Sequence, residues 1–269
     1  MLPAEVRRAV GSYLGRADRL LPGRVVGAYV FGSTALGAYR PGRSDIDLLV
    51  VLDDAAVTAA DRRRLRALHL AQTPRMLAGL ARTRRLFAMC NAVFVHRADL
   101  SLPVTRIVPV ASHVGHEFTA GAGFDVNPVM WQVLATRGMT VRGPKPAELD
   151  LDPEPDHLRE WNLANLRDYW AAQAERLAVG GRPIRAAAVE WNVLGPLRLH
   201  ATIATGAVLS KQEAGAYGIR AFGRDVEPIV AVALASLTGH APPAAPPREH
   251  WRVSTADLMN RVIEDAAGL

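Results

Sequence analysis

The sequence contains a single cysteine, Cys90, so it can form neither an intrachain disulfide nor a cysteine-rich zinc site. Because Cys90 lies in an apolar run, we predict that it is a core residue rather than a nucleophile. No apolar run approaches the length of a membrane span, and the chain does not open with a basic and then apolar signal segment. We therefore expect a cytoplasmic protein without a membrane association.

Aromatic residues are also scarce, at 6% of the chain, and they are not interleaved with the arginine clusters at residues 62–66 and 82–85. Such interleaving is typical of proteins that stack nucleic acid bases. The net charge of +6 suits an anionic partner such as a nucleoside triphosphate, and it would also suit RNA or DNA. Because the clusters fit solvated helix faces, we do not expect nucleic acid binding. We also expect the protein to be a monomer.

The most informative pattern joins a glycine–serine pair, Gly32 and Ser33, to two carboxylates, Asp45 and Asp47, that open an apolar run. Alternate residues of a strand share one face, so the two carboxylates lie on the same side. They repel each other unless a cation lies between them, and hard divalent cations prefer oxygen ligands. Gly32 permits a close backbone approach, and Ser33 with the following amides can hold phosphate oxygens at a helix N-terminus.

A divalent-metal clamp beside a phosphate cradle is what phosphoryl or nucleotidyl transfer requires. Taken alone, an Asp-x-Asp is usually a solvated strand end and a Gly-Ser is usually a turn. Here the glycine and serine follow one apolar strand and the carboxylates begin the next, after a short connection rich in glycine, proline and arginine. This order favours a functional site.

The pattern Gly32-Ser33 followed by Asp45-Ile46-Asp47 resembles the signature of the polymerase-beta-like nucleotidyltransferase superfamily. Within it, the segment at residues 31–50 is similar to the aminoglycoside 3''/9 adenylyltransferases of the streptomycin/spectinomycin type. The resemblance implies transfer of AMP, or another NMP, from ATP or another NTP to a hydroxyl of an aminoglycoside-like or aminocyclitol-like small molecule. It also implies Asp45 and Asp47 as catalytic Mg²⁺ ligands, and Gly32, Ser33 and Ser44 around the phosphates.

The first part of the chain reads as a small α/β unit. Apolar spacing predicts a helix over residues 4–20, strands over 25–31 and 86–96, and a helix or helix pair over 55–80. The second strand continues from the carboxylates through residues 48–52. We expect loop with short strand pieces from 97 to 127, a helix over 128–136 and a turn over 141–144. His113 and His116 are interpreted as loop histidines, because such a pair alone is weak support for a zinc site.

The remainder reads as an all-helical bundle. An acidic, proline-punctuated segment at residues 148–160 suits a linker, and we predict a nucleotidyltransferase domain over 1–150 and a helical domain over 151–269. The predicted helices cover residues 156–178, 183–205, 210–222, 226–237 and 254–267.

The resemblance extends into the helical part, where Lys211 follows thirteen residues after Arg198. The family places this arginine and lysine on the triphosphate, and cations there stabilise charge on the leaving pyrophosphate. The alternative is that Lys211 begins an exposed helix and Arg198 pairs with a neighbouring acid. For the acceptor, the resemblance points to Phe118 and Glu190, and Trp170 is a further candidate that would serve equally well as a core residue.

One expected feature is missing. Active members of the family carry a third carboxylate on the next strand, yet residues 89–95 contain no acid, and Cys90 or Asn91 occupies its place. A neutral amide is a poor proton acceptor. Glu117, Asp125 or Glu190 could replace it from elsewhere in the chain. Two alternatives to an active small-molecule nucleotidyltransferase therefore stay open: a catalytically impaired nucleotide-binding homologue, acting as a sensor or biosynthetic accessory protein, and a nucleotidyltransferase acting on nucleic acid or protein.

Overall fold

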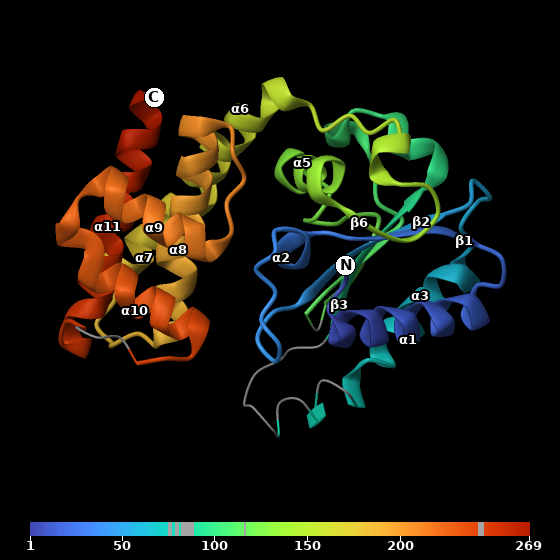
Figure 1. The fold of residues 1–269 in the computed structure, drawn as a ribbon, viewed down its shortest axis with the longest axis horizontal. Helices are drawn as coiled ribbons and strands as arrows, with labels where there is room; N and C mark the ends of the chain where they lie inside the picture. The colour runs from blue at the N-terminus through green and yellow to red at the C-terminus, as the bar shows by residue number, and fades with distance from the viewer. Residues whose placement is uncertain (75–76, 79–80, 82–88, 116, 242–244) are drawn as a thin grey trace. The chain divides into compact units, whose positions relative to one another are not determined.

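The structure is a computed structural model that describes residues 1–74, 77–78, 81, 89–115, 117–241 and 245–269. The chain divides into two compact units, an N-terminal unit at Met1–Pro155 and a C-terminal unit at Asp156–Leu269 (Figure 1). The division expected from the acidic linker lies at residue 150. Each unit has its own buried core.

The N-terminal unit is built on a mixed sheet of six strands in the order β5-β4-β3-β2-β1-β6. Only β2 and β3 pair in parallel, and the other neighbours pair antiparallel. The strands are β1 (Val25–Val30), β2 (Ile46–Leu52), β3 (Cys90–His96), β4 (Ala111–Val114), β5 (Glu117–Ala120) and β6 (Met139–Arg142). The predicted strand over residues 86–96 is confirmed from Cys90 onward, and residues 86–88 lie outside the described residues.

Helices cover both faces of this sheet. The predicted first helix is confirmed as α1 (Ala4–Leu20), which lies with α3 (Ala59–Leu70) on one face (Figure 1). The short α2 (Gly32–Ala35) and α5 (Pro128–Arg137) lie on the other. Alternate residues of β2, beginning with Ile46, join the core under α1. The intervening residues of β2, beginning with Asp47, therefore face α2 and α5.

Capping side chains define where two of these helices begin. Thr58 caps α3 through a reciprocal capping box with Asp61, so the helix begins at Ala59 rather than at the predicted residue 55. The later part of the predicted 55–80 helix falls partly outside the described residues. Asn127 caps α5 by accepting a hydrogen bond from Met130 N at 3.0 Å, and Pro128 occupies the first helical turn.

The turn predicted over residues 141–144 is wrong in part, because Met139–Arg142 forms the edge strand β6 against β1. Arg142 anchors this strand by donating to both carboxylate oxygens of Asp18, at 2.7 and 2.8 Å, and to the carbonyl of Val25 at 3.1 Å. These partners are distant in the sequence. A strand of only four residues carries little periodic signal of its own.

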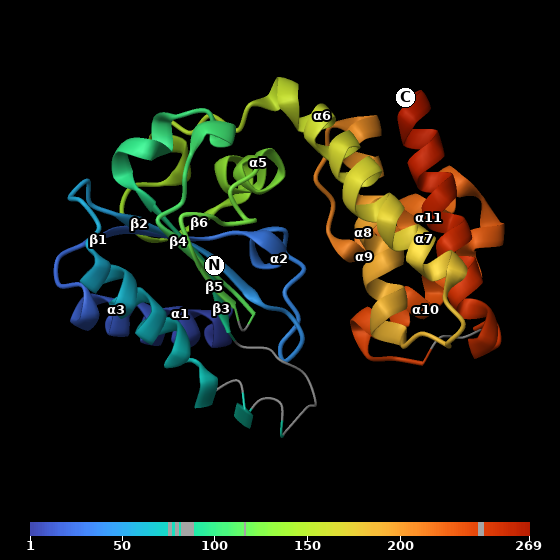
Figure 2. The ribbon, with the colours of Figure 1, turned by 180° about the vertical axis from the view of Figure 1, so that it is seen from behind.

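The C-terminal unit is helical, as predicted. Its central helix α8 packs against α9, α10 and α11, and α11 also packs along α7 (Figure 2). A π-helical turn at Leu166–Trp170 joins α6 to α7. The helices are α6 (Pro155–Asn165), α7 (Ala171–Val179), α8 (Ala186–Thr205), α9 (Lys211–Phe222), α10 (Glu227–Thr238) and α11 (Trp251–Gly268). None of the helices that the structure describes is both long and apolar enough to cross a membrane.

Candidate nucleotidyl-transfer site

Gly32 and Asp47 are in direct contact at the point where β1 ends and β2 begins. Phe31 N donates a hydrogen bond to the carbonyl of Asp47 at 3.1 Å, which extends the ladder by one residue. Gly32 has a φ of +57°, a conformation that side chains with a Cβ rarely adopt. A Cβ on Gly32 would overlap Oδ2 of Asp47 and lie 2.7 Å from its Cγ. Only glycine therefore lets this turn lie against the carboxylate.

Asp45 directly precedes β2 and is exposed, whereas Asp47 is half-buried. Ile46 between them is fully buried in the core under α1. The alternation of β2, extended back by one residue, gives Asp45 the same side as Asp47. The two carboxylates thus belong to the sheet face that carries α2 and α5, and Asp47 contacts the turn at Gly32.

The backbone of the turn after Gly32 is closed by its own hydrogen bonds. Leu36 N donates to the Gly32 carbonyl at 3.0 Å, and Ala38 N donates to the carbonyl of the half-buried Ser33 at 2.9 Å. Thr34 Oγ1, in the same turn, is buried and has no hydrogen-bond partner. The turn therefore holds a hydroxyl whose hydrogen-bonding capacity its own unit does not use.

Ser44 closes the connection that leads to the carboxylates. Its Oγ accepts a hydrogen bond from Arg40 N at 3.0 Å, and Ser44 N donates to the Arg40 carbonyl at 3.0 Å. The hydroxyl proton of Ser44 can still be donated to an anion. Ser44 thus fixes the turn just before Asp45 as well as being a candidate phosphate ligand.

The parallel register of β2 and β3 pairs Asp47 with Asn91 and Ile46 with Cys90. Cys90 is buried in the core under α1, so Asn91 is the residue on the same face as Asp47. Asn91 is 7% exposed, and its Oδ1 accepts a hydrogen bond from Gly115 N at 3.0 Å. Of the two residues that the sequence left open, Asn91 therefore occupies the place of the expected third carboxylate. It is a neutral amide, and it is bound to the turn between β4 and β5.

Three acids were considered from sequence as replacements for the missing carboxylate. Glu117 lies on β5, the exposed edge of the sheet, opposite Val114. Glu190 belongs to the C-terminal unit. Asp125 lies in the segment that enters α5, and burial together with the charge of Asp45 raises the pKa of Asp125 to about 6. Of the two acids in the N-terminal unit, Asp125 is the one whose pKa the charge of Asp45 raises.

In the C-terminal unit, Lys211 and Arg198 lie among partners from their own unit. Lys211 Nζ is 2.9 Å from Oε1 of Glu190, and the other oxygen of Glu190 accepts from Ser236 Oγ at 3.0 Å. Arg198 Nε donates to the carbonyl of Leu209 at 2.9 Å. The predicted arginine, lysine and glutamate therefore come from the same part of the unit, at α8 and the start of α9.

Aromatic side chains border this cluster, although they are not the ones that the sequence singled out. Trp191 is 50% exposed, and its ring centroid lies 5.9 Å from Lys211 Nζ. Its indole N–H donates to the hydroxyl of the exposed Tyr169 at 3.3 Å. In the sequence, only its position directly after Glu190 pointed to Trp191 as a site residue. No sequence feature pointed to Tyr169.

The structure places two predicted acceptor residues in cores. Trp170 is 5% exposed, belongs to the core between α7 and α11, and packs so closely on Gly195 that a Cβ there would overlap its ring. Phe118 packs against the core under α1, with its ring centroid 5.3 Å from that of His113. It thus lies on the opposite sheet face from Asp47. Trp170 therefore has the core position that the sequence left open as its alternative role.

His113 is a buried strand residue on β4 and not the loop histidine that the sequence indicated. Its Nδ1 is 2.7 Å from the hydroxyl of Tyr13, and its ring centroid lies 4.8 Å from that of His69. Burial and the neighbouring His69 lower the pKa of His113 to about 3. His116 lies outside the described residues. Within the part of the chain that the structure describes, no three His, Cys, Asp or Glu side chains converge as a metal site.

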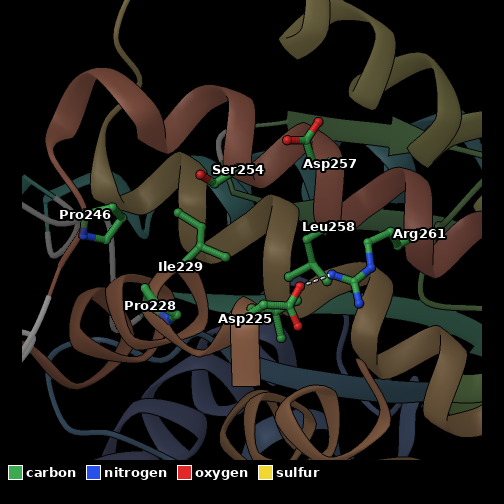
Figure 3. Close-up of a pocket in the computed structure, with 9 residues that line it drawn as sticks. Asp225, Pro228, Ile229, Pro246, Ser254, Asp257, Leu258 and Arg261 are labelled. Atoms are coloured by element: carbon green, nitrogen blue, oxygen red, sulfur yellow. Dashed lines mark hydrogen bonds and ion pairs between the residues drawn. The ribbon is translucent and has the colours of Figure 1, made fainter. Parts of the chain in front are cut away.

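A separate cavity of about 350 Å³ lies in the C-terminal unit between η5 (Arg224–Val226), α10 and α11 (Figure 3). Arg261 forms an ion pair with Asp225 at 2.5 Å in its wall, and it also donates to the carbonyl of Phe222 at 2.6 Å. None of the site residues predicted from the sequence lines this cavity. Its lining consists of Asp225, Val226, Pro228, Ile229, Pro246, Ser254, Asp257, Leu258 and Arg261.

Comparison with known proteins finds two similarities. Residues 12–75 match the family model described as a nucleotidyltransferase domain, and this match includes the glycine turn and both carboxylates. Among solved structures, the chain is similar to spectinomycin adenyltransferase AAD(9) from Enterococcus faecialis, determined with ATP and spectinomycin. The TM-score is 0.64 over 94% of this chain and 98% of that chain, at 13% sequence identity. A comparison with curated proteins found no match.

These findings support the nucleotidyltransferase superfamily and confirm the predicted fold class, an α/β nucleotidyltransferase domain followed by a helical bundle. At 13% identity the likeness to the adenyltransferase is a likeness of fold.

Proposed function

We propose that the protein is a magnesium-dependent nucleotidyltransferase that moves AMP, or another NMP, from an NTP to a hydroxyl of an aminoglycoside-like or aminocyclitol-like small molecule. The observation that carries the proposal is the contact between Gly32 and Asp47. This turn accepts only glycine, and it lies against one of two paired carboxylates. Such an arrangement supports a site that binds phosphate and a divalent cation together.

The residues at this turn fit a divalent cation. Asp45 and Asp47 are oxygen donors on one side of the sheet, and Mg²⁺ is usually bound through one or two carboxylates together with substrate phosphates. When bound, the cation would neutralise charge on the triphosphate and on the leaving group. The protein side chains would then orient the α-phosphorus toward the attacking hydroxyl, with Ser33 and Ser44 donating hydrogen bonds to phosphate oxygens.

Arg198 and Lys211 are proposed as the cations that steady the triphosphate. Lys211 is engaged by Glu190 at 2.9 Å, so a nucleotide would compete with this carboxylate for the ammonium group. Glu190 also accepts from Ser236, and this second hydrogen bond would keep part of its charge satisfied when Lys211 turns to phosphate. Release of Lys211 would free the Glu190 carboxylate and the face of Trp191, both of which Lys211 Nζ contacts in this structure.

A carboxylate beside an aromatic face suits a polycationic acceptor, because amines pair with carboxylates and lie over aromatic rings. Glu190 and Trp191 supply both features, and we propose them as acceptor contacts in place of Phe118 and Trp170. The fold likeness to an adenyltransferase solved with spectinomycin supports an acceptor of the aminocyclitol class.

The direct test incubates the purified chain with Mg²⁺ and each NTP against a panel of aminoglycosides and aminocyclitols. Mass spectrometry should detect an acceptor heavier by one nucleotidyl group. Asp45→Ala should abolish the product, and Asp150→Ala, which removes an exposed carboxylate outside the site, should not. Unchanged transfer by the Asp45→Ala variant would remove the assignment.

A second candidate is a nucleotide-binding homologue without turnover, acting as a sensor or a biosynthetic accessory protein. It is favoured by Asn91, the neutral register partner of Asp47. In that case calorimetry would detect ATP binding in the presence of Mg²⁺ while the acceptor panel stays unmodified. Appearance of transfer in an Asn91→Glu variant would support this alternative, and turnover by the native chain would eliminate it.

A further inference from the structure

The net charge of the chain belongs to its N-terminal unit. Residues 1–155 contain 20 arginine and lysine residues against 14 aspartate and glutamate residues, which gives a formal net charge of +6. Residues 156–269 contain 12 of each kind and are neutral. Helices α1 and α3 together hold eight arginines and three acids, a net charge of +5. Two helices of one unit therefore carry almost the whole excess.

The acids of α1 and α3 are already engaged by the fold. Asp61 caps α3, its side chain is 8% exposed, and it pairs with Arg64 at 3.0 Å. Asp18 accepts both hydrogen bonds of the Arg142 guanidinium. Glu5 is half-buried. The exposed sides of these two helices, both of which the structure describes in full, therefore carry arginine charge without matching carboxylates.

Six arginines of α1 and α3 are exposed and form no ion pair or side-chain hydrogen bond with any described residue. We call this set the basic face, and it consists of Arg7, Arg8, Arg19, Arg62, Arg63 and Arg66. On α3, Arg66 lies three and four residues after two of the others, so the three are neighbours on the helix surface and repel one another. An anion bound among them would remove this repulsion.

The two helices present these arginines on one surface. Helices α1 and α3 pack against each other on the same face of the sheet (Figure 1). Their apolar sides meet in one core, which contains Tyr13 of α1 and Leu65 of α3. Arg16 of α1 also donates to the carbonyl of Ala71, at the end of α3, at 2.5 Å. Because the apolar sides face this shared core, the arginines on the opposite sides of both helices face outward together.

The basic face is extended rather than compact. Arg8 and Arg19 are eleven residues apart in α1, which corresponds to about 16 Å along a helix. Packed helices lie about 8–10 Å apart, so the face is also wider than one row of side chains. A small anion would meet only a few of the six guanidinium groups. A nucleic acid duplex carries one charge per about 1.7 Å of its axis, so a duplex lying on the face could meet all of them.

The side chains of the face fit phosphate better than bases or lipid. All six are arginine, whose guanidinium group binds phosphate oxygens through paired hydrogen bonds. The scarcity of aromatic residues argues against base stacking, but contacts to a phosphate backbone need only cations. Tyr13 is the only aromatic residue of the two helices, and it is buried. Leu70 is their only large apolar side chain that is exposed, which is too little to insert into a membrane surface.

We propose that the basic face binds the phosphate backbone of a double-stranded nucleic acid, without sequence preference. This function is separate from the proposed nucleotidyl transfer, because α1 and α3 cover the sheet face opposite to the one that carries Asp47. It does not require nucleic acid to be the acceptor of the transfer.

The test measures binding of the full chain to a fluorescently labelled DNA duplex by anisotropy, without NTP, between about 50 and 200 mM salt. The double variant Arg63→Gln/Arg66→Gln should weaken binding about tenfold or more at the lower salt concentration. It should also reduce the slope of log affinity against log salt by about 2, because each lost phosphate contact removes about 0.9. Arg8→Gln/Arg19→Gln, on α1, should act in the same direction.

The matched control is Arg182→Gln/Arg185→Gln, which removes the same charge from exposed positions in the C-terminal unit and should leave affinity and slope unchanged. Circular dichroism melting would show that each variant is folded. Equal weakening by the control would overturn the inference, because net charge and not the basic face would then drive binding. Failure of the native chain to bind the duplex would overturn it too, including the case in which the chain binds only phosphatidylserine vesicles.

The test also keeps this inference apart from the proposed function. Arg63→Gln/Arg66→Gln should transfer nucleotide to a small-molecule acceptor as the native chain does, because both positions lie on the opposite side of the sheet from Asp47. Duplex binding that depends on the basic face would support the inference even if no acceptor on the panel is modified.

Discussion

The two units hold their candidate residues by different means. In the N-terminal unit, Asp47 is fixed by a backbone hydrogen bond from Phe31 and by its contact with Gly32. In the C-terminal unit, Lys211 is held by the charge of Glu190 and lies over the face of Trp191. Backbone packing fixes the carboxylate before any ligand arrives, whereas side-chain charge holds the lysine in a position from which an anion can draw it.

This difference separates what each unit can contribute. A site fixed by backbone geometry is preorganised, and preorganised charges are those that stabilise a transition state most effectively. Lys211 is one-third exposed and is held by a single side chain, so its charge is less preorganised than that of Asp47. Loss of a carboxylate charge in the N-terminal unit should therefore mainly change the reaction rate, and loss of the Lys211 charge in the C-terminal unit should divide its effect between stability and nucleotide affinity.

The largest effect is expected from Asp47→Asn, which removes the charge but keeps the shape. The rate of nucleotidyl transfer should fall about 100- to 1,000-fold, in the range observed when one preorganised electrostatic group is lost. Initial rates at saturating acceptor measure the loss, with Asp150→Asn as the control at an exposed position. A fall of less than about fivefold would contradict a central role for the carboxylate.

Gly32→Ala, measured beside a control glycine, should separate the effect of backbone strain from the effect of the contact with Asp47. The Cβ would overlap the carboxylate, so we expect a loss of roughly 2–4 kcal/mol in the free energy of unfolding and loss of ATP binding. Gly37→Ala is the matched control: its φ is +71°, but a Cβ there meets nothing within 4 Å.

The control variant should lose only the roughly 1–2 kcal/mol of a left-handed alanine and should bind ATP normally. Urea unfolding and calorimetric titration with ATP measure the two quantities. Equal losses of stability and of ATP binding in both variants would mean that strain alone, and not the contact with Asp47, explains the glycine.

Much of the fold follows from local sequence patterns. The helix at residues 4–20, the strand entering at Asp45 and the helical C-terminal part each carry their own periodicity, and the structure confirms them. The edge strand β6 was missed because its partners, β1 and Asp18, are distant in the chain. A pattern within four residues cannot report such a partner.

The candidate site divides in the same way. The relation of Gly32 to the two carboxylates follows from one hairpin-like segment, so its spacing could be read directly from the sequence. The choice between Cys90 and Asn91 required the register of β2 with β3, which sequence spacing does not determine. Asp125 could be named from sequence only as one of several acids, because its place depends on how residues 123–127 lie on the sheet.

Lys211→Met tests the C-terminal side of the comparison. It leaves Glu190, whose side chain is 12% exposed, without its cation, so the free energy of unfolding should fall by about 1–2 kcal/mol. ATP affinity should fall as well if Lys211 binds the triphosphate. Adding Glu190→Gln removes the uncompensated charge, so the double variant should recover stability without recovering ATP affinity. Recovery of both would mean that Lys211 serves the fold alone.

The smallest effect concerns two buried histidines, one in each unit, each 2.7 Å from a tyrosine hydroxyl through Nδ1. Nε2 of His200 meets the carboxylate of Asp265 at 2.8 Å, whereas His113 is fully buried with its ring centroid 4.8 Å from that of His69. His113 therefore stays neutral in the fold, with its pKa lowered to about 3 from an ordinary value of 6.5.

Below pH 6.5 the unfolded chain takes up a proton at His113 and the folded chain does not. Above pH 6.5 His113 is neutral in both states, so the free energy of unfolding is at its full value there. The free energy of unfolding falls as the pH is lowered toward 3, by about 1 kcal/mol between pH 6.5 and 5.5. Urea unfolding at these two pH values should show that loss, and His113→Phe should remove it. Phe94→Leu, beside the same ring, should lower stability equally at both values. If the His113→Phe variant keeps the full pH dependence, the titrating group lies elsewhere, and the contrast between the two histidines is not its cause.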